Sequence, residues 1–317
     1  MPVIIFTEHS EDIIKKSSLE AISYGVALAV KLNTEAISLV VGQTKAPLKS
    51  LGEYGVKKVI HADDLNINVS DNQCMATIIT NAAVKFNADT IIFSNTISAK
   101  GIAPRVSVKL KAGMVSGAVS LPDITNGFVV KKNVFSGKAF ADINILSNKK
   151  IITLNSNAFE ISKPGGEATV EKLEVEKLTS SIKITAVHKI EGEIPLAEAD
   201  KVVSAGRGMK GPENWGMIEE LAKLLGAATA CSRPVSDSDW RPHHEHVGQT
   251  GLSIAPNLYI AVGISGAIQH LAGVNRSKTI VVINKDPEAP FFKSADYGIV
   301  GDAFDVVPKI IAAVKAL

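Results

Sequence analysis

Short apolar segments alternate with longer amphipathic ones along most of this chain. In the first half, the apolar runs lie at residues 3–6, 37–41, 57–60 and 90–93, and helical patterns lie at 12–31 and 73–86. Strands separated by helices pair through crossovers, which favours a parallel sheet covered by helices on its faces. The alternation therefore predicts an α/β fold.

The pattern changes after Gly113, where β-rich segments follow one another with turns between them. These segments lie at residues 128–130, 139–146, 151–154 and 182–188, and a turn signal lies at Lys163–Gly166. Consecutive strands without intervening helices are typical of antiparallel pairing. We therefore expect antiparallel strands to be added to the first parallel sheet.

A second βα series occupies the C-terminal part of the chain. Its strands are predicted at residues 201–205, 227–231, 258–264, 279–283 and 297–300, with helices at 212–225, from 267 and from 304. Five strands joined by helical crossovers predict a doubly wound sheet. Such sheets bind ligands in a crevice at the carboxyl ends of their strands.

The chain has 317 residues, which exceeds what one hydrophobic core usually organises. The Gly, Pro and charges of Glu191–Pro195 make this segment the best linker candidate. We therefore predict two domains, an α/β domain over residues 1–190 and a doubly wound domain over residues 191–317.

Charge and cysteine content exclude several classes. The 34 basic and 32 acidic side chains nearly cancel, so the chain lacks the positive charge that nucleic-acid binding requires. Two distant cysteines suggest neither a disulfide framework nor a thiolate metal site. No apolar run is long enough to span a bilayer. We expect a cytoplasmic protein, or one of an organelle matrix if a transit peptide has been removed.

Two glycine-rich segments follow predicted strands. Gly206–Gly211 matches G-x-G-x-x-G, but the acidic ribose partner about 20 residues on is absent, which disfavours classical NAD binding. A glycine-rich turn with a surface Arg207 is the alternative. Gly263–Gly266 is the better phosphate cradle, with Ser265 as an added donor, although a purely structural turn also explains its glycines.

Two charged or titratable side chains lie near these segments. His270 stands one helical turn after Gly266 and so shares a face with the cradle. Arg233 ends an apolar strand in the expected ligand loop, where a permanent cation needs an anionic partner. The alternatives are a structural histidine and a surface or interdomain salt bridge.

His243–His246 offers four potential metal ligands in a row. Adjacent residues of an extended segment point to opposite sides, and the spacing matches no usual zinc pattern. We therefore expect no metal and interpret this segment as a solvated loop, with Trp240 in a packing or docking role.

Four segments together resemble the FAD-binding domain of the electron transfer flavoprotein alpha subunit: Ser232–Pro234, Val247–Gly251, Ala261–His270 and Ile283–Pro287. The resemblance is dense from Val202 onward and weaker but continuous upstream. It implies that FAD is bound by Arg207, Ser232, Arg233, Gln249, Thr250, Gly251, Gly263, Ser265, Gly266, His270, Asn284 and Asp302.

The resemblance also implies individual roles. Arg233 packs over the isoalloxazine ring, Thr250 lies against N5 and O4, and His270 hydrogen-bonds the C2 carbonyl. Gln249 lies near the ribityl chain, and Asn284 and Asp302 meet the adenosine half. Asp302 is also a good helix N-cap before Phe304, and both roles fit only if one oxygen is spare.

The implied function is electron carriage rather than catalysis. The resembled family forms a heterodimer with a beta subunit, accepts electrons from flavin dehydrogenases such as the acyl-CoA dehydrogenases of fatty acid β-oxidation, and passes them to a quinone oxidoreductase through an anionic semiquinone. No hydrolase motif and no catalytic residue is identified. The alternatives are a non-redox adenine-nucleotide module and an NAD-dependent dehydrogenase subunit, and a bifurcating variant depends on the beta subunit.

Overall fold

The computed structural model describes residues 1–10, 12–64, 67–176, 178–180, 182–186 and 194–316. The chain forms two compact units, Met1–Val134 with Lys138–His188, and Lys189–Leu317 with Phe135–Gly137. The boundary predicted near residue 190 lies outside the described residues. Among the described helices, none combines the length and apolar character needed to cross a membrane.

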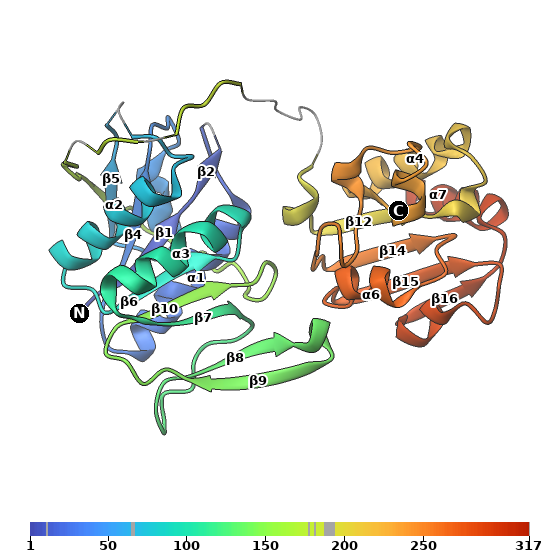
Figure 1. Ribbon diagram of the computed structural model, residues 1–317. Coiled ribbons are helices and arrows are strands. Elements are labelled where there is room, and N and C mark those ends of the chain that lie inside the picture. The colour runs from blue at the N-terminus through green and yellow to red at the C-terminus, as the bar shows by residue number, and fades with distance from the viewer. Residues whose placement is uncertain (11, 65–66, 177, 181, 187–193, 317) are drawn as a thin grey trace. The chain divides into compact units, whose positions relative to one another are not determined.

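The first unit is built on a nine-stranded sheet with the order β11-β5-β4-β1-β6-β10-β7-β8-β9 (Figure 1). Neighbours from β11 to β7 are parallel, and β7, β8 and β9 pair antiparallel. In chain order the strands are β1 (Val3–Thr7), β4 (Ala36–Val41), β5 (Lys58–Ala62), β6 (Thr90–Ser94), β7 (Gly113–Ala118), β8 (Val129–Val134), β9 (Ala139–Asn144), β10 (Lys150–Leu154) and β11 (Thr169–Lys172).

Helices bury both faces of this sheet. Ile4 and Phe6 of β1 share a core with α2 (Asn72–Lys85) and α3 (Ile97–Leu110). Val3 and Ile5 point the other way and share a core with α1 (Lys16–Lys31). Successive side chains of a strand alternate between faces, so a strand covered on both sides is apolar throughout. This explains the unbroken apolar runs in the sequence.

Several expectations for the first unit need correction. The segment before α1 is a two-stranded ribbon of β2 (His9–Ser10) and β3 (Ile13–Ile14), so the predicted helix begins at Lys16 instead of 12. Strand β10 is not part of the antiparallel addition, because it pairs parallel to β6 and β7. Residues 182–186 form no strand, since Ile182 and Ile184 stay about half exposed and have no face to pack against. The sequence reading also missed α3, β7 and β11.

The second unit contains the predicted doubly wound sheet, with five parallel strands in the order β13-β12-β14-β15-β16. One core packs beneath α4 and α7, and another lies on the side of α6. The elements are β12 (Lys201–Ala205), α4 (Gly216–Leu225), β13 (Ala228–Cys231), α5 (Arg233–Ser236), β14 (Leu258–Val262), α6 (Ile268–Val274), β15 (Thr279–Asn284), β16 (Tyr297–Val300) and α7 (Ala303–Lys315).

Strand order reverses between β12 and β14 in this sheet. The chain goes from β12 outward to β13 and then returns to the other side of β12 as β14. The connections from these two strands therefore diverge at their carboxyl ends, and the space between them is where doubly wound sheets bind ligands.

Substitution of Gly52 tests a close backbone contact at the edge of the first sheet. A methyl group there would overlap the backbone of Glu167 and Ala168, which leads into β11. We expect Gly52→Ala to lower the free energy of unfolding by about 1–3 kcal/mol, as for overpacked sites, and to speed amide hydrogen exchange in β11. Gly216→Ala is the control, because it meets no atom within 4 Å and should be neutral or stabilising by up to about 1 kcal/mol. Equal unfolding curves for the two variants would contradict this account.

Candidate cofactor site

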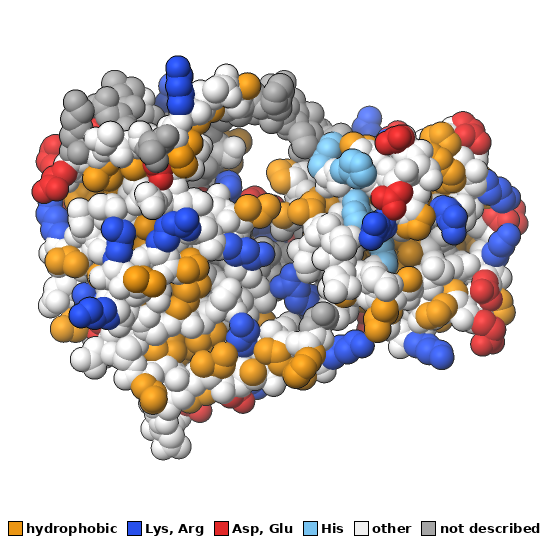
Figure 2. Space-filling view, in the orientation of Figure 1, with side chains coloured by type: hydrophobic (Ala, Val, Ile, Leu, Met, Phe, Trp, Pro, Cys, Tyr) orange, Lys and Arg blue, Asp and Glu red, His pale blue; other side chains and the backbone are white. Residues whose placement is uncertain are grey.

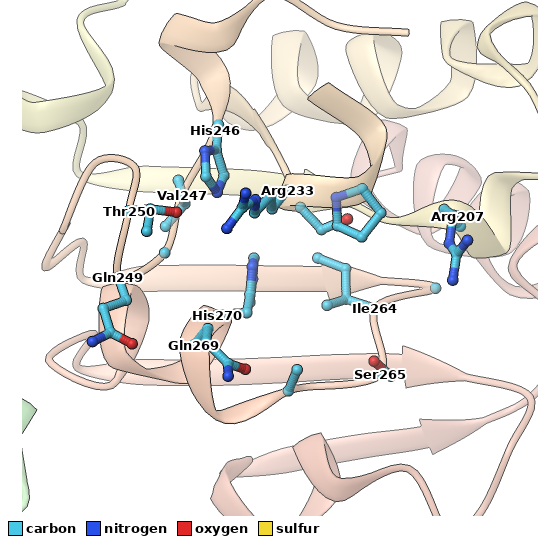
Figure 3. A pocket seen from close by; sticks show the side chains of 15 residues that line it. Arg207, Arg233, His246, Val247, Gln249, Thr250, Ile264, Ser265, Gln269 and His270 are labelled. Atoms are coloured by element: carbon cyan, nitrogen blue, oxygen red, sulfur yellow. The ribbon is translucent and has the colours of Figure 1, made fainter. Parts of the chain in front are cut away.

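A cavity of about 420 Å³ lies in the second unit, at the ends of β12, β13 and β14 (Figure 3). Its lining comes from the loops after these strands and from the start of α5 and α6. The lining residues are Arg207, Ser232, Arg233, Pro234, His246, Val247, Gly248, Gln249, Thr250, Gly263, Ile264, Ser265, Ala267, Gln269 and His270. The cavity thus occupies the crevice that the strand order predicts.

Glycines let the two central loops touch backbone to backbone. The amides of Gly206 and Gly208 donate to the carbonyls of Val262 and Gly263, at 2.9 and 3.1 Å. A methyl group on Gly208 would lie 2.6 Å from Cα of Gly263, and one on Gly206 would overlap the Gly263 carbonyl. Gly263 also has φ of +61°, which disfavours any residue with a side chain.

The G-x-G-x-x-G segment does not open a helix. Residues Arg207–Met209 and Pro212–Asn214 form two short 3-10 turns, and α4 begins only at Gly216. The helix predicted over 212–225 therefore begins four residues later than expected. The first two glycines of the motif serve the loop contact with Gly263. The side chain of Arg207 nevertheless lines the cavity.

The second glycine segment is held by packing. Gly266, with φ of +82°, lies so close to Phe291 that a side chain would meet its backbone. The Asn284 side chain donates to the Ile264 carbonyl at 2.9 Å and braces the loop from β15. Gly266 and Asn284 therefore shape the loop from outside the cavity, whereas Ser265 lines it.

Arg233 is the first residue of α5 and lines the cavity. Figure 3 shows its guanidinium beside the ring of His246. It pairs with Asp237 at 3.2 Å, but the Arg233 side chain is 62% exposed and Asp237 55%. Exposed ion pairs are worth about 0–1 kcal/mol. This contact, which matches the salt-bridge alternative, therefore leaves the cation available to an anion in the cavity.

His270 is buried at the cavity wall. Its Nε2 lies 2.8 Å from the hydroxyl of Tyr259, and Nδ1 has no hydrogen-bond partner in the described part of the chain. Burial, together with a smaller effect of His246 and against an opposing effect of the Val247 backbone, lowers the pKa of His270 to about 4. The imidazole is therefore neutral near pH 7.

The segment 243–246 is only partly solvated, which corrects the expectation for it. Figure 2 shows histidine side chains together on one face of this unit, and His243 and His244 are exposed. Glu245 and His246 are buried. Within the described ranges, no three potential ligands of the His, Cys, Asp or Glu type are close enough to hold a metal ion.

A buried ion pair explains why this loop turns inward. Arg241 contacts Glu245 at 2.5 and 2.9 Å and also reaches Glu219 of α4 at 2.7 Å. Thr229 of β13 donates to the same Glu245 carboxylate at 3.2 Å. The pair fixes the chain immediately before His246, whose ring lines the cavity. The sequence reading missed His246, although it directly precedes the Val247–Gly251 segment.

The loop 247–251 continues along the cavity. The Gln249 amide donates to the Gln269 carbonyl at 2.7 Å, which ties this loop to the start of α6. The side chains of Gln249 and Thr250 line the cavity, whereas Gly251 packs against the His246 backbone and does not. Val247 and Gln269 also line it and belong to segments singled out in the sequence.

Asp302 lies away from the cavity and caps α7. Its carboxylate accepts from the Phe304 amide at 3.0 Å and lies 3.8 Å from the Lys210 ammonium. The N-cap interpretation of this residue is therefore confirmed. Arg207, Ser232, Arg233, Gln249, Thr250, Gly263, Ser265 and His270 of the predicted set come together, and Gly251, Gly266, Asn284 and Asp302 lie outside the cavity lining.

Cys231 ends β13 next to this site. Its side chain is fully buried, and burial together with the Glu245 charge raises the pKa of the thiol to about 12, against a smaller effect of Arg241. The residue is therefore a protonated thiol that packs in the core beneath α4.

A doubly wound domain with a cavity at its switch point is typical of proteins that bind nucleotide cofactors. Residues 195–275 match the family described as the electron transfer flavoprotein FAD-binding domain, and residues 3–178 match the electron transfer flavoprotein domain. The chain therefore belongs to the electron transfer flavoprotein alpha subunit family, and its second unit carries an FAD-binding domain.

Relatives of similar length support this assignment. Electron transfer flavoprotein subunit alpha of Bacillus subtilis is 35% identical over 99% of this chain and 98% of its own. The Pseudomonas aeruginosa protein of the same name is 34% identical over 99% and 100%. A Caenorhabditis elegans protein named as a probable mitochondrial subunit alpha is 35% identical over 98% and 92%.

The residues of the cavity fit FAD. Nδ1 of His270 lacks a partner among the described residues, so a polar atom of a ligand in the cavity can pair with it. The lining holds two guanidinium groups and no carboxylate. Phosphates and a ring that gains electrons both favour such surroundings.

The Arg241–Glu245 pair gives a test of the loop. Arg241→Ala leaves the Glu245 carboxylate buried without its cation, so we expect the free energy of unfolding to fall by about 3–5 kcal/mol. Lys315→Ala is the control, because Lys315 and Glu220 also lie close, at 2.6 Å, but both are about half exposed. That variant should change stability by about 0–1 kcal/mol. Denaturant unfolding compares them, and similar losses in both would refute the structural role of the buried pair.

Proposed function

We propose that this chain is the FAD-carrying subunit of a soluble electron carrier. It accepts electrons from flavin dehydrogenases such as acyl-CoA dehydrogenases and passes them to a quinone oxidoreductase or another acceptor, one electron at a time. Family membership and the names of the relatives support electron transfer. The structural observation that carries the proposal is the charge of the cavity, which holds Arg207 and Arg233 and no acidic lining residue.

The positive charge of the cavity lining determines its effect on a bound flavin. FAD supplies the redox chemistry when bound, and the chain supplies binding, orientation and electrostatics. An added electron brings negative charge, which a neighbouring guanidinium stabilises more strongly than it stabilises a neutral ring. Arg233 is the group we assign to this effect, because its position beside the cavity places a permanent cation there at any physiological pH.

The other cavity residues orient the ring. The hydroxyl of Thr250 and the imidazole of His270 are assigned to the polar atoms of the ring edge, and Gln249 to the ribityl chain. His270 acts as a neutral hydrogen-bonding group, because its pKa of about 4 keeps it uncharged near pH 7. Asn284 ends β15, and Asp302 follows β16. Both lie on the side of the sheet that we assign to the adenosine half of FAD.

The relatives are named as alpha subunits, which supports assembly with a beta subunit. In this proposal the first unit provides contacts with that subunit, and the second presents the flavin to donors and acceptors. We place this complex of the two subunits in the bacterial cytoplasm or in an organelle matrix.

Arg233→Ala tests the charge argument in the chain purified with its beta subunit. Charge-assisted contacts are worth about 1.5–3 kcal/mol, and a tenfold change in a one-electron equilibrium is about 59 mV. We therefore expect the first reduction potential to fall by about 60–130 mV, or FAD to be lost. Spectroelectrochemical titration measures this, and Lys309→Ala on α7, which removes an exposed cation outside the cavity, is the matched control.

Three results would count against these assignments. An unchanged potential and FAD content in Arg233→Ala would remove the role given to Arg233. A colourless complex that takes up no FAD would overturn the carrier function and favour a non-redox nucleotide module. Direct reduction by NADH, without a second enzyme, would favour an NAD-dependent dehydrogenase.

A further inference from the structure

His246 is a buried polar residue of the cavity without a partner. The residue is 8% exposed and lines the cavity, and no hydrogen bond joins its ring to any described residue. Unlike Nδ1 of His270, its ring nitrogens are not sealed off, so they are open to the cavity. Figure 3 shows the ring directed into the cavity beside Arg233. Because no described residue occupies these nitrogens, they are available to a polar group of a ligand in the cavity.

The surrounding chain makes room for this ring. A methyl group on Gly251 would lie 2.8 Å from Nδ1 of His246, and one on Gly248 would lie 3.4 Å from Nε2. Two hydrogen bonds hold the His246 backbone. Its amide donates to the His243 carbonyl at 3.1 Å, and the Leu252 amide donates to the His246 carbonyl at 2.9 Å. The ring is thus placed by fixed backbone and not by a flexible surface loop.

Five titratable or charged groups lie around His246. Burial lowers its pKa most, Asp237 opposes this, and Arg233 and His243 lower the pKa further. His270 lies across the cavity and interacts with it unfavourably when both are charged. The carboxylate of Glu245 is occupied by Arg241 and Thr229. His246 is therefore neutral near pH 7 while its cavity holds no negative charge.

We propose that His246 contacts the redox ring of FAD directly and takes up one proton from water when that ring accepts one electron. This inference rests on the function proposed above. The electron would come from the donor protein and remain on the ring. The proton would pass from hydronium in the solvent to the free imidazole nitrogen, so that one O–H bond breaks as one N–H bond forms. Loss of the electron returns the proton to water. His246 thereby couples the charge of the ring to pH.

The coupling has a defined sign. A negative ring raises the pKa of a neighbouring imidazole, so reduction binds a proton only between the pKa values of the oxidised and reduced states. The stabilisation of the reduced state is complete below this window and is lost as the pH rises through it. Within the window, each pH unit changes the one-electron equilibrium up to tenfold, which corresponds to about 59 mV.

The experiment measures the first one-electron potential from pH 5.5 to 9 in the chain purified with its beta subunit. The unsubstituted protein should show a sloping region that becomes flat at high pH, and His246→Gln should be flat throughout. His244→Gln, an exposed neighbour outside the cavity lining, should keep the slope. A slope that persists in His246→Gln would assign the proton to another group, such as His270, and overturn the proposal.

A second measurement follows the imidazole in the unsubstituted protein, and the variant serves only to assign its signal. Histidine-ring NMR should show one imidazole whose pKa rises on reduction, and the signal absent from His246→Gln identifies it. An imidazole of His246 with equal pKa in both redox states would also overturn the inference. Failure to bind FAD at all would instead reject the proposed function, so the two failures are distinguishable.

Discussion

Two loops of the second unit meet backbone against backbone, and the cofactor cavity depends on that contact. Gly206 and Gly208 follow β12, Gly263 follows β14, and amide–carbonyl hydrogen bonds join them. The contact brings the ends of neighbouring parallel strands together without any side chain between them. Everything else at the site, including Arg207 and Ser265, is placed relative to this floor.

An ion pair positions the cavity wall that contains His246. The loop from Trp240 to Val247 carries charges and histidines that alone would favour water, yet the ion pair of Arg241 and Glu245 fixes its middle against β13 and α4. A buried pair is weak evidence of stability but a strong constraint on conformation when further hydrogen bonds satisfy it. Polar surroundings with a fixed arrangement are what a cofactor that changes charge requires.

The sequence predicted periodic features well and long-range contacts poorly. The five strands of the second unit and their doubly wound arrangement follow from apolar runs and helical crossovers, and β1, β4, β5 and β6 follow in the same way. Strand β10 was assigned to the wrong pairing because its partners, β6 and β7, are distant in sequence. The family resemblance identified the cavity residues in the strand-end loops. It did not identify His246, because the burial of this residue depends on a salt bridge that no periodicity reveals.

Cys231 lies buried next to the cofactor cavity, where burial would limit its oxidation. A flavin that gives electrons to oxygen generates peroxide at short range, and peroxide oxidises thiolates rather than thiols. The Cys231 side chain has no solvent exposure, and its pKa of about 12 leaves almost no thiolate. A sulfur at the edge of a redox site is therefore inert toward oxidative damage, although it ends the strand that leads directly to Ser232 and Arg233.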